Sequence, residues 1–270
     1  MLCFAALFIL GSEIVEAWLP HQTQGVFSAT LILSRESLLL AVVTGATLCL
    51  GALEKRGLGD YGLPPRGVLR GLGWGTALAF CSLSLLVVLL SGAGVLRLGG
   101  TSLSPAQVVA NGGAWAATFL VVALFEELLL RGYAQATLAR SLGFWPAALV
   151  LSLLFAAMHA RNGGETRLGL LAVACFGLFF CWTLWRTGSL WFAVGFHACW
   201  DWAESFFYGV PDSGALMDGH FLSASFSGPA WLSGGTAGPE GSVLVLAVLA
   251  AAALTLRRPV AGELPGRQAA

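Results

Sequence analysis

The sequence predicts an all-α, polytopic membrane helix bundle, and three observations lead to this fold class. Hydrophobic residues make up 57% of the 270 residues, and the mean hydropathy is +0.81. Charged residues make up only 10%, against about 25% in soluble globular domains. Apolar runs of helix length recur along nearly the whole chain, without the alternation typical of barrel strands. Because a bilayer requires each span to pair its own backbone polar groups, such runs predict helices.

We expect about eight transmembrane helices from the lengths of these runs. They are residues 1–19, 31–53, 71–92, 112–138, 144–160, 168–186, 188–207 and 242–256. The first segment carries Glu13 and Glu16, so it either spans the bilayer or lies at its interface. Since neither an internal repeat nor a soluble domain interrupts the series, we predict a single membrane domain over residues 1–270.

Basic residues in the loops predict the orientation of the chain. Residues 54–70 carry one lysine and three arginines, whereas residues 209–241 have no lysine or arginine and are rich in Gly, Ser and Pro. Cytoplasmic loops are enriched in Lys and Arg. We therefore expect residues 54–70 in the cytoplasm and residues 209–241 on the opposite side of the membrane.

Charge and composition also limit the partners and the compartment. The net charge is zero and no basic block occurs, which excludes nucleic acid as an expected partner. Lys55 is the only lysine among 14 basic residues, a bias typical of GC-rich genomes. We therefore expect an integral protein of a bacterial plasma membrane, surrounded by membrane lipid.

Two adjacent glutamates, Glu126 and Glu127, interrupt the apolar run 114–138, which also carries Arg131. A charge at mid-membrane costs about 2.5–3.5 kcal/mol on insertion scales, so such residues are usually partnered and functional. Glu127 precedes Arg131 by four residues, the favoured orientation of a helical ion pair. Glu126 points about 100° away from Glu127 and can face a polar cavity as a general base. A packing ion cluster without chemistry is the alternative.

Two histidines lie on later apolar segments. His159 closes the run 144–159, where a histidine at the membrane interface is the alternative interpretation. His197 is followed one turn later by Asp201, so both side chains project from one helix face. Such a pair can orient an imidazole tautomer, ligate a metal or face a developing oxyanion. Cys199 lies two residues from each and on another face, so we do not expect a thiol nucleophile.

Taken together, these residues form three spaced motifs. They are Glu126-Glu127-xxx-Arg131, Phe155-xxx-His159 and His197-xxx-Asp201. The series resembles the motifs of the CPBP family, the CAAX-protease and bacteriocin-processing membrane proteases, also called the Abi family. The resemblance covers residues 112–208, which we predict to be the catalytic core. It implies an intramembrane endopeptidase that hydrolyses peptide bonds of membrane-associated proteins or peptides.

The same resemblance implies roles for the candidate catalytic residues. Glu126 and His159 would activate a water molecule, and His197 and Asp201 would face the oxyanion. Position 201 is more often Asn in this family, and an amide can donate a hydrogen bond. An ionised carboxylate cannot donate, so Asp201 must be protonated or must act on His197 instead.

Glu127 and Arg131 would support the site. A glutamic-type mechanism without a cofactor is favoured by the resemblance, and a zinc ion held by Glu126, His159 and His197 is the alternative. Two other functions stay open at this point. A catalytically silent membrane scaffold is disfavoured by the full set of ionisable residues. A proton-coupled transporter is disfavoured because the sequence lacks paired, broken-helix repeats.

Overall fold

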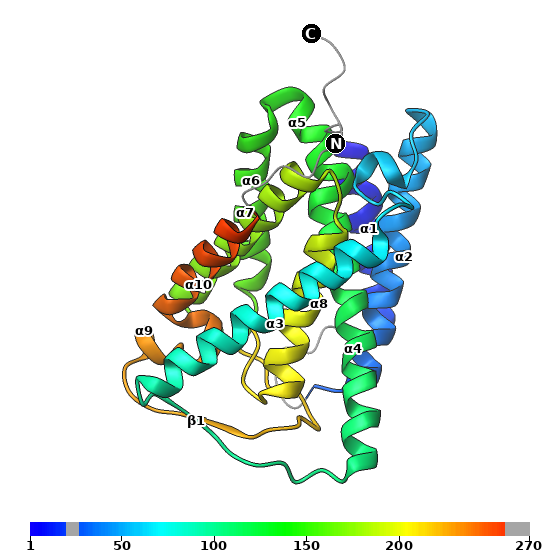
Figure 1. Cartoon of the computed structure of the whole chain (residues 1–270). Coiled ribbons are helices and arrows are strands. Elements are labelled where there is room, and N and C mark those ends of the chain that lie inside the picture. The colour runs from blue at the N-terminus through cyan, green and yellow to red at the C-terminus, as the bar shows by residue number, and fades with distance from the viewer. Residues whose placement is uncertain (20–26, 257–270) are drawn as a thin grey trace.

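The computed structural model describes residues 1–19 and 27–256, and it confirms the all-α helix-bundle class (Figure 1). Its longer helices are α1 (Leu2–Trp18), α2 (Ala29–Leu53), α3 (Val68–Gly92), α4 (Pro105–Glu127), α5 (Gln135–Leu142), α6 (Phe144–His159), α7 (Arg167–Thr187), α8 (Trp191–Trp202) and α10 (Val243–Thr255). Each predicted apolar segment coincides with a helical stretch to within a few residues. The exception is α4, which begins at Pro105 rather than at residue 112.

Side-chain caps explain where three of these helices begin. Ser104 forms a capping box with Gln107, and Pro105 occupies the first helical position of α4. The Thr166 hydroxyl accepts a hydrogen bond from a backbone N–H in the first turn of α7, and Ser242 does the same for α10. The early start of α4 thus follows from a polar capping signal, which an apolar pattern does not contain.

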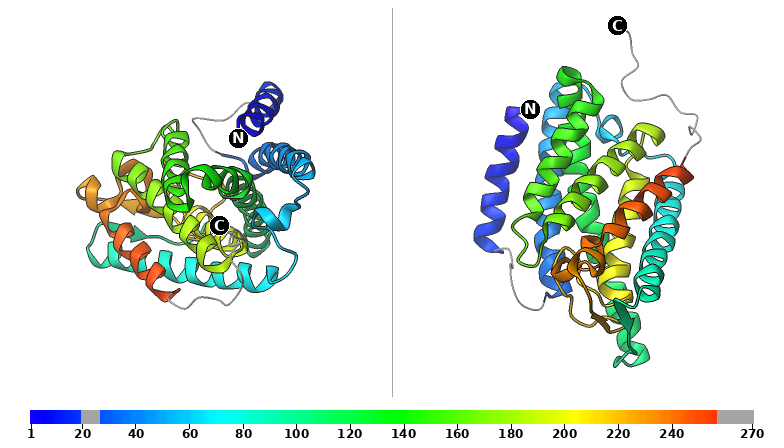
Figure 2. Two further views of the ribbon diagram at one scale, coloured as in Figure 1. Left: turned by 90° about the horizontal axis from the view of Figure 1, so that it is seen from above. Right: turned by 90° about the vertical axis from the view of Figure 1, so that its left-hand side faces the viewer.

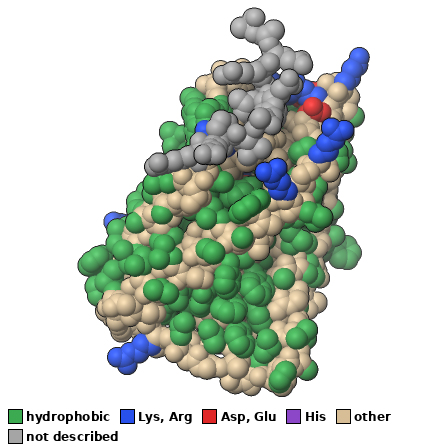
Figure 3. Space-filling model, viewed as in Figure 1, with side chains coloured by type: hydrophobic (Ala, Val, Ile, Leu, Met, Phe, Trp, Pro, Cys, Tyr) green, Lys and Arg blue, Asp and Glu red, His purple; other side chains and the backbone are tan. Residues whose placement is uncertain are grey.

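Among the described residues, four helical stretches are long and apolar enough to cross a membrane: α2, α3, α7 and the stretch Pro105–Leu142, which comprises α4, a π-helical segment and α5. The helices α6 and α10 are apolar but shorter. Hydrophobic side chains cover much of the visible face of the bundle, as a lipid-facing surface requires (Figure 3). The exposed hydrophobic side chains of the bundle include Leu85 and Val88 of α3 and Leu149 and Leu153 of α6. The polytopic class is therefore confirmed, and the number of crossings stays a prediction.

The connecting segments gather at two opposite ends of the bundle (Figure 1). One end holds α5, the start of α1 and the basic loop after α2, which contains the short helix η1 (Leu58–Tyr61). The other end holds strands β1 (Leu96–Leu98) and β2 (Ala224–Phe226), which pair antiparallel. The short helices α9 (Ala230–Ser233) and η5 (Pro239–Gly241) belong to the same long connection as β2. The basic loop and residues 209–241 therefore lie at opposite ends, as the predicted orientation requires.

Helices α3 and α8 cross at close range because glycines face each other at the crossing. A Cβ atom on Gly75 would clash with the carbonyl oxygen of Phe192, and one on Gly195 would clash with that of Leu72. This contact fixes the position of α8, which carries His197. Helix α1 lies at the edge of the molecule beside α2 (Figure 2).

Candidate active site

The predicted site residues lie on three neighbouring helical stretches. Glu126 and Glu127 are the last two residues of α4, His159 is the last residue of α6, and His197 and Asp201 lie one turn apart on α8. The side chains of Glu127 and Arg131 have no exposed surface, whereas those of Glu126, Asp201 and His197 are 17%, 11% and 9% exposed. The ion pair is therefore sealed, and the other three groups form the accessible side of the cluster.

Glu127 makes two short contacts within the cluster. Its Oε1 atom lies 3.1 Å from Arg131 Nη1 and 3.1 Å from His197 Nδ1. The predicted Glu127–Arg131 ion pair is thus present in the structure. The bond to His197 is a finding that the sequence reasoning missed. One of the two roles considered for Asp201, holding the imidazole tautomer, is here taken by Glu127, because Glu127 accepts the Nδ1 hydrogen.

Glu126 and Asp201 approach the other nitrogen of the same imidazole. Glu126 Oε2 and Asp201 Oδ2 each lie 3.5 Å from His197 Nε2, a separation typical of a loose ion pair. Within residues 1–19 and 27–256, Glu126 Oε2 has no hydrogen-bond partner. Glu127 Oε2 also has no hydrogen-bond partner among the described residues, so the two carboxylates differ in that Glu127 holds Arg131 and His197 at 3.1 Å through its other oxygen.

His159 stands apart from this cluster. Its Nδ1 atom lies 3.0 Å from the carbonyl oxygen of Phe155, one turn earlier on α6. No hydrogen bond joins His159 to Glu126 or His197 in the described part of the chain. The structure thus brings Glu126, His197 and Asp201 into direct proximity, while His159 is linked to them through Phe155.

Phe155 explains the aromatic position of the second motif. Its ring centroid lies 4.6 Å from the guanidinium carbon of Arg131, a cation–π distance. The ring also makes edge contacts with His159, at 4.5 Å between centroids, and with His197, at 6.2 Å. On the other side of His197, Phe180 stacks on the imidazole at 5.2 Å. Phe155 and Phe180 therefore pack against both histidines and Arg131, and neither adds a charge to the site.

The two helices that carry the glutamates and the His197–Asp201 pair change to π geometry directly after these candidate residues. The π segment η2 (Leu128–Ala134) follows Glu127 and carries Arg131, and η3 (Ala203–Phe207) begins two residues after Asp201. Within η2, Gly132 has non-helical backbone angles, φ −82° and ψ −115°. Such π segments are rare and occur frequently at functional sites. They went unpredicted because no distinct hydrophobic period marks them.

The zinc alternative can be tested against the geometry. Zinc–ligand bonds of about 2.0–2.1 Å place tetrahedral donor atoms about 3.3 Å apart. The pair Glu126–His197 meets this spacing, but Glu126, His159 and His197 together do not bring their donor atoms within 4.8 Å of one another. In the described conformation the three donor atoms are therefore not assembled for tetrahedral zinc, and the presence or absence of a metal stays a prediction.

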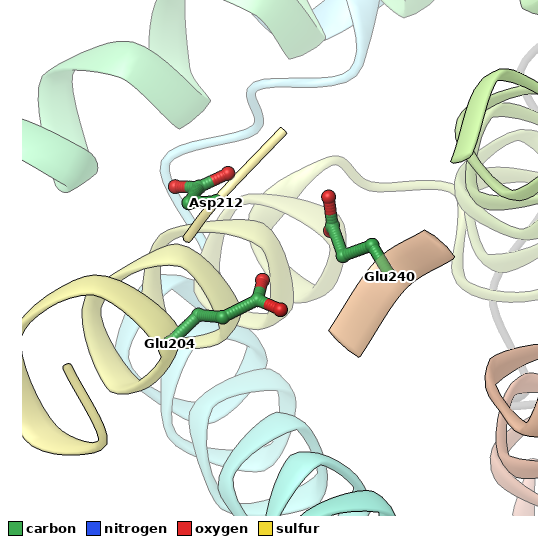
Figure 4. A group of neighbouring side chains, drawn as sticks. All are labelled: Glu204, Asp212 and Glu240. Carbon is green, nitrogen blue, oxygen red and sulfur yellow. The ribbon is translucent and has the colours of Figure 1, made fainter. Parts of the chain in front are cut away.

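A second group of acidic residues was not predicted. Glu204, Asp212 and Glu240 each place one carboxylate oxygen within 4.8 Å of the other two (Figure 4). Burial, followed by the charge of Asp212, raises the pKa of Glu240 to about 8. Burial likewise raises the pKa of Asp212 to about 6. The available signal was Glu204 itself, a further carboxylate only three residues after Asp201 in an apolar run.

A comparison with protein-family models gives one match. Residues 109–203 match the family described as Rce1-like, type II CAAX prenyl endopeptidases. No curated protein and no solved structure matches the chain significantly. The match covers less than half of the chain, yet it includes all three motifs and ends just before Glu204. It confirms the family resemblance that the motifs indicated.

Proposed function

We propose that the chain is a glutamic-type intramembrane endopeptidase, on the basis of the match of residues 109–203 to the Rce1-like, type II CAAX prenyl endopeptidase family. Its substrate is a protein or peptide held at the membrane, and its nucleophile is water. The family supports a CAAX-type intramembrane protease in general, and the catalytic type is our proposal. The observation that carries it is Glu126 Oε2, an acceptor without a hydrogen-bond partner among the described residues, 3.5 Å from His197 Nε2.

Glu126 acts as the general base in this mechanism. Its carboxylate takes a proton from a water molecule that His159 also holds, and the resulting hydroxide adds to the scissile carbonyl carbon. When the tetrahedral intermediate collapses, the C–N bond breaks and Glu126 returns the proton to the leaving amine. With Nδ1 bonded to the Phe155 carbonyl, the neutral ring of His159 keeps Nε2 as an acceptor for the water.

His197 and Asp201 face the oxyanion in this proposal. An oxyanion is stabilised by donors that are already oriented before the reaction. Glu127 holds the His197 ring through Nδ1, so His197 donates Nε2–H to the oxyanion as the protonated imidazolium, and Asp201 lies near that nitrogen. Asp201 donates in its protonated form, as the amide of an Asn would. The buried ion pair with Arg131 fixes the position of Glu127, and Glu127 in turn fixes the His197 ring.

The mechanism includes no step on zinc, because the donor atoms of Glu126, His159 and His197 are not gathered around one point. Measuring cleavage in the presence of a zinc chelator with nitrogen donors tests this metal-free mechanism. 1,10-Phenanthroline should leave cleavage unchanged, and zinc should neither be required nor restore activity after chelation. Inactivation by phenanthroline with recovery on adding zinc would contradict the glutamic mechanism.

The experiment on the proposed function uses the full chain in nanodiscs with a panel of fluorescent membrane peptides. The panel contains peptides with and without a lipidated C-terminal cysteine, so that the substrate class is read from the same assay. Wild type should produce new N-termini, detected by mass spectrometry, and Glu126→Gln should not. Cys199→Ala is the matched control, since Cys199 packs in the hydrophobic core with Leu83 of α3. Loss of cleavage in Cys199→Ala with retention in Glu126→Gln would overturn the proposal.

A further inference from the structure

Three carboxylates meet at one place outside the matched segment of the chain. Glu204 lies in η3, Asp212 in the connection after it, and Glu240 in η5, just before α10. Figure 4 shows the three side chains pointing toward a common centre from these separate segments. One oxygen of each lies within 4.8 Å of the other two.

Glu204 is the unusual member of this acidic site. Its side chain is fully buried, and neither carboxylate oxygen has a hydrogen-bond partner in the described part of the chain. A buried carboxylate without a partner costs several kcal/mol or is neutralised. An unpaired carboxylate aimed at two others can therefore be stabilised in two ways, by protonation or by a cation at their centre.

The neighbours of the acidic site supply only neutral donors. Ser205 Oγ donates to Asp212 at 3.1 Å, Trp200 Nε1 to Glu240 at 2.9 Å, and Ser213 Oγ to Glu240 at 3.1 Å. Within residues 1–19 and 27–256, no lysine or arginine forms a salt bridge with any of the three carboxylates. The neutral donors fix the direction of two carboxylates, and no described lysine or arginine pairs with them.

We propose that Glu204, Asp212 and Glu240 bind a Ca²⁺ ion. An all-oxygen set selects hard cations, and three carboxylates are typical of calcium rather than of zinc or copper sites. Mg²⁺, by contrast, is usually held by one or two carboxylates together with substrate phosphates and waters. One oxygen of each carboxylate lies within 4.8 Å of the other two, which leaves room for Ca–O bonds of about 2.3–2.6 Å, and water completes the coordination.

The position of the acidic site gives the ion a structural role. It joins the end of α8, which carries His197 and Asp201, to the connection 209–241 and to the start of α10. These segments lie at the end of the bundle opposite the basic loops (Figure 1). A bound Ca²⁺ would therefore hold the long connection against the helix that carries part of the active site.

The test uses the full chain in nanodiscs, washed with EGTA and exchanged into chelator-free buffer at pH 7.5. CaCl₂ is titrated by calorimetry, and retained calcium is measured by elemental analysis after gel filtration. We expect one ion per chain, a rise of the unfolding temperature with CaCl₂, and a weaker response to MgCl₂. Glu204→Gln and Glu240→Gln should weaken binding about tenfold or more, because charge count sets calcium affinity. Asp218→Asn is the control, since this exposed carboxylate lies in the same connection but outside the acidic site.

A wild-type measurement keeps the proposal testable if a variant does not fold. Tb³⁺, which replaces Ca²⁺, should luminesce on excitation of tryptophan, because Trp200 touches the site, and CaCl₂ should quench that signal by displacement. Retained calcium near zero in wild type, or an MgCl₂ affinity equal to that for CaCl₂, would overturn the assignment. So would unchanged calcium binding in a folded Glu204→Gln. In that case the cluster is a set of protonated carboxyl groups.

Discussion

Glu126 and Glu127 are neighbours in sequence, yet the structure gives their loss different consequences. Glu127 and Arg131 are both without exposed surface at 3.1 Å, and breaking one side of such a pair costs about 3–5 kcal/mol. At about 2–4 °C per kcal/mol for a chain near this size, Glu127→Gln should lower the unfolding temperature by roughly 6–20 °C. The variant keeps an acceptor for His197 but leaves the guanidinium without its counter-charge.

Glu126→Gln should behave in the opposite way. Its side chain is 17% exposed and its ion pair with His197 Nε2 is long, at 3.5 Å, so the loss of stability should be smaller than for Glu127→Gln. Removal of a general base should reduce the cleavage rate about 10²- to 10⁴-fold. Glu126→Gln therefore separates catalysis from folding, and Glu127→Gln does not.

The assay is thermal unfolding in nanodiscs, followed by tryptophan fluorescence, together with peptide cleavage by the same samples. A double variant, Glu127→Gln with Arg131→Gln, removes the unpaired charge as well as its partner. Its loss of stability should be smaller than the sum of the two single losses. Equal unfolding temperatures for Glu126→Gln and Glu127→Gln would refute the division between a sealed ion pair and an accessible base.

Three further variants test separate parts of the account. Asp201→Asn should extend cleavage to higher pH, since an amide donates at every pH, and an Asn variant slower at all pH values would exclude the donor role. Phe155→Leu should lower stability by at least about 0.5–2 kcal/mol, the cation–π contribution over Arg131, with unchanged unfolding contradicting the contact. The hydrogen bond from Arg140 lowers the pKa of Glu54, so Glu54 stabilises the fold above its ordinary pKa and loses this effect as pH falls through the folded pKa. Glu54→Gln should therefore cost about 0.2–1 kcal/mol at pH 7 and nothing in acid, whereas a cost independent of pH would disprove the linkage.

The helices were predictable because a long, continuous apolar segment forms a helix when it crosses a membrane. The Glu127–Arg131 pair was predictable from helical spacing alone. The contact between Glu127 and His197 was not, because it depends on the rotation of α8 against α4. That rotation is set by packing across the chain, including the close crossing at Gly75 and Gly195, and no local pattern encodes it.

The acidic site was not predictable from the sequence, for a different reason. Glu204, Asp212 and Glu240 are separated by long stretches, and two of them lie in an irregular connection. Only the conformation of residues 209–241 brings them together, and Gly, Ser and Pro allow many conformations there. A lone carboxylate in an apolar run, such as Glu204, is the kind of residue whose partner should be sought across the fold.

Cleavage by purified wild type and Glu126→Gln, each with and without 1,10-phenanthroline, tests the central claim most directly. The proposed mechanism predicts that wild type cleaves the membrane peptide equally well in both conditions. It also predicts that folded Glu126→Gln, verified by its unfolding temperature, cleaves in neither. Cleavage by Glu126→Gln at the wild-type rate would contradict a glutamate-activated water, as would inactivation of wild type by phenanthroline that zinc reverses.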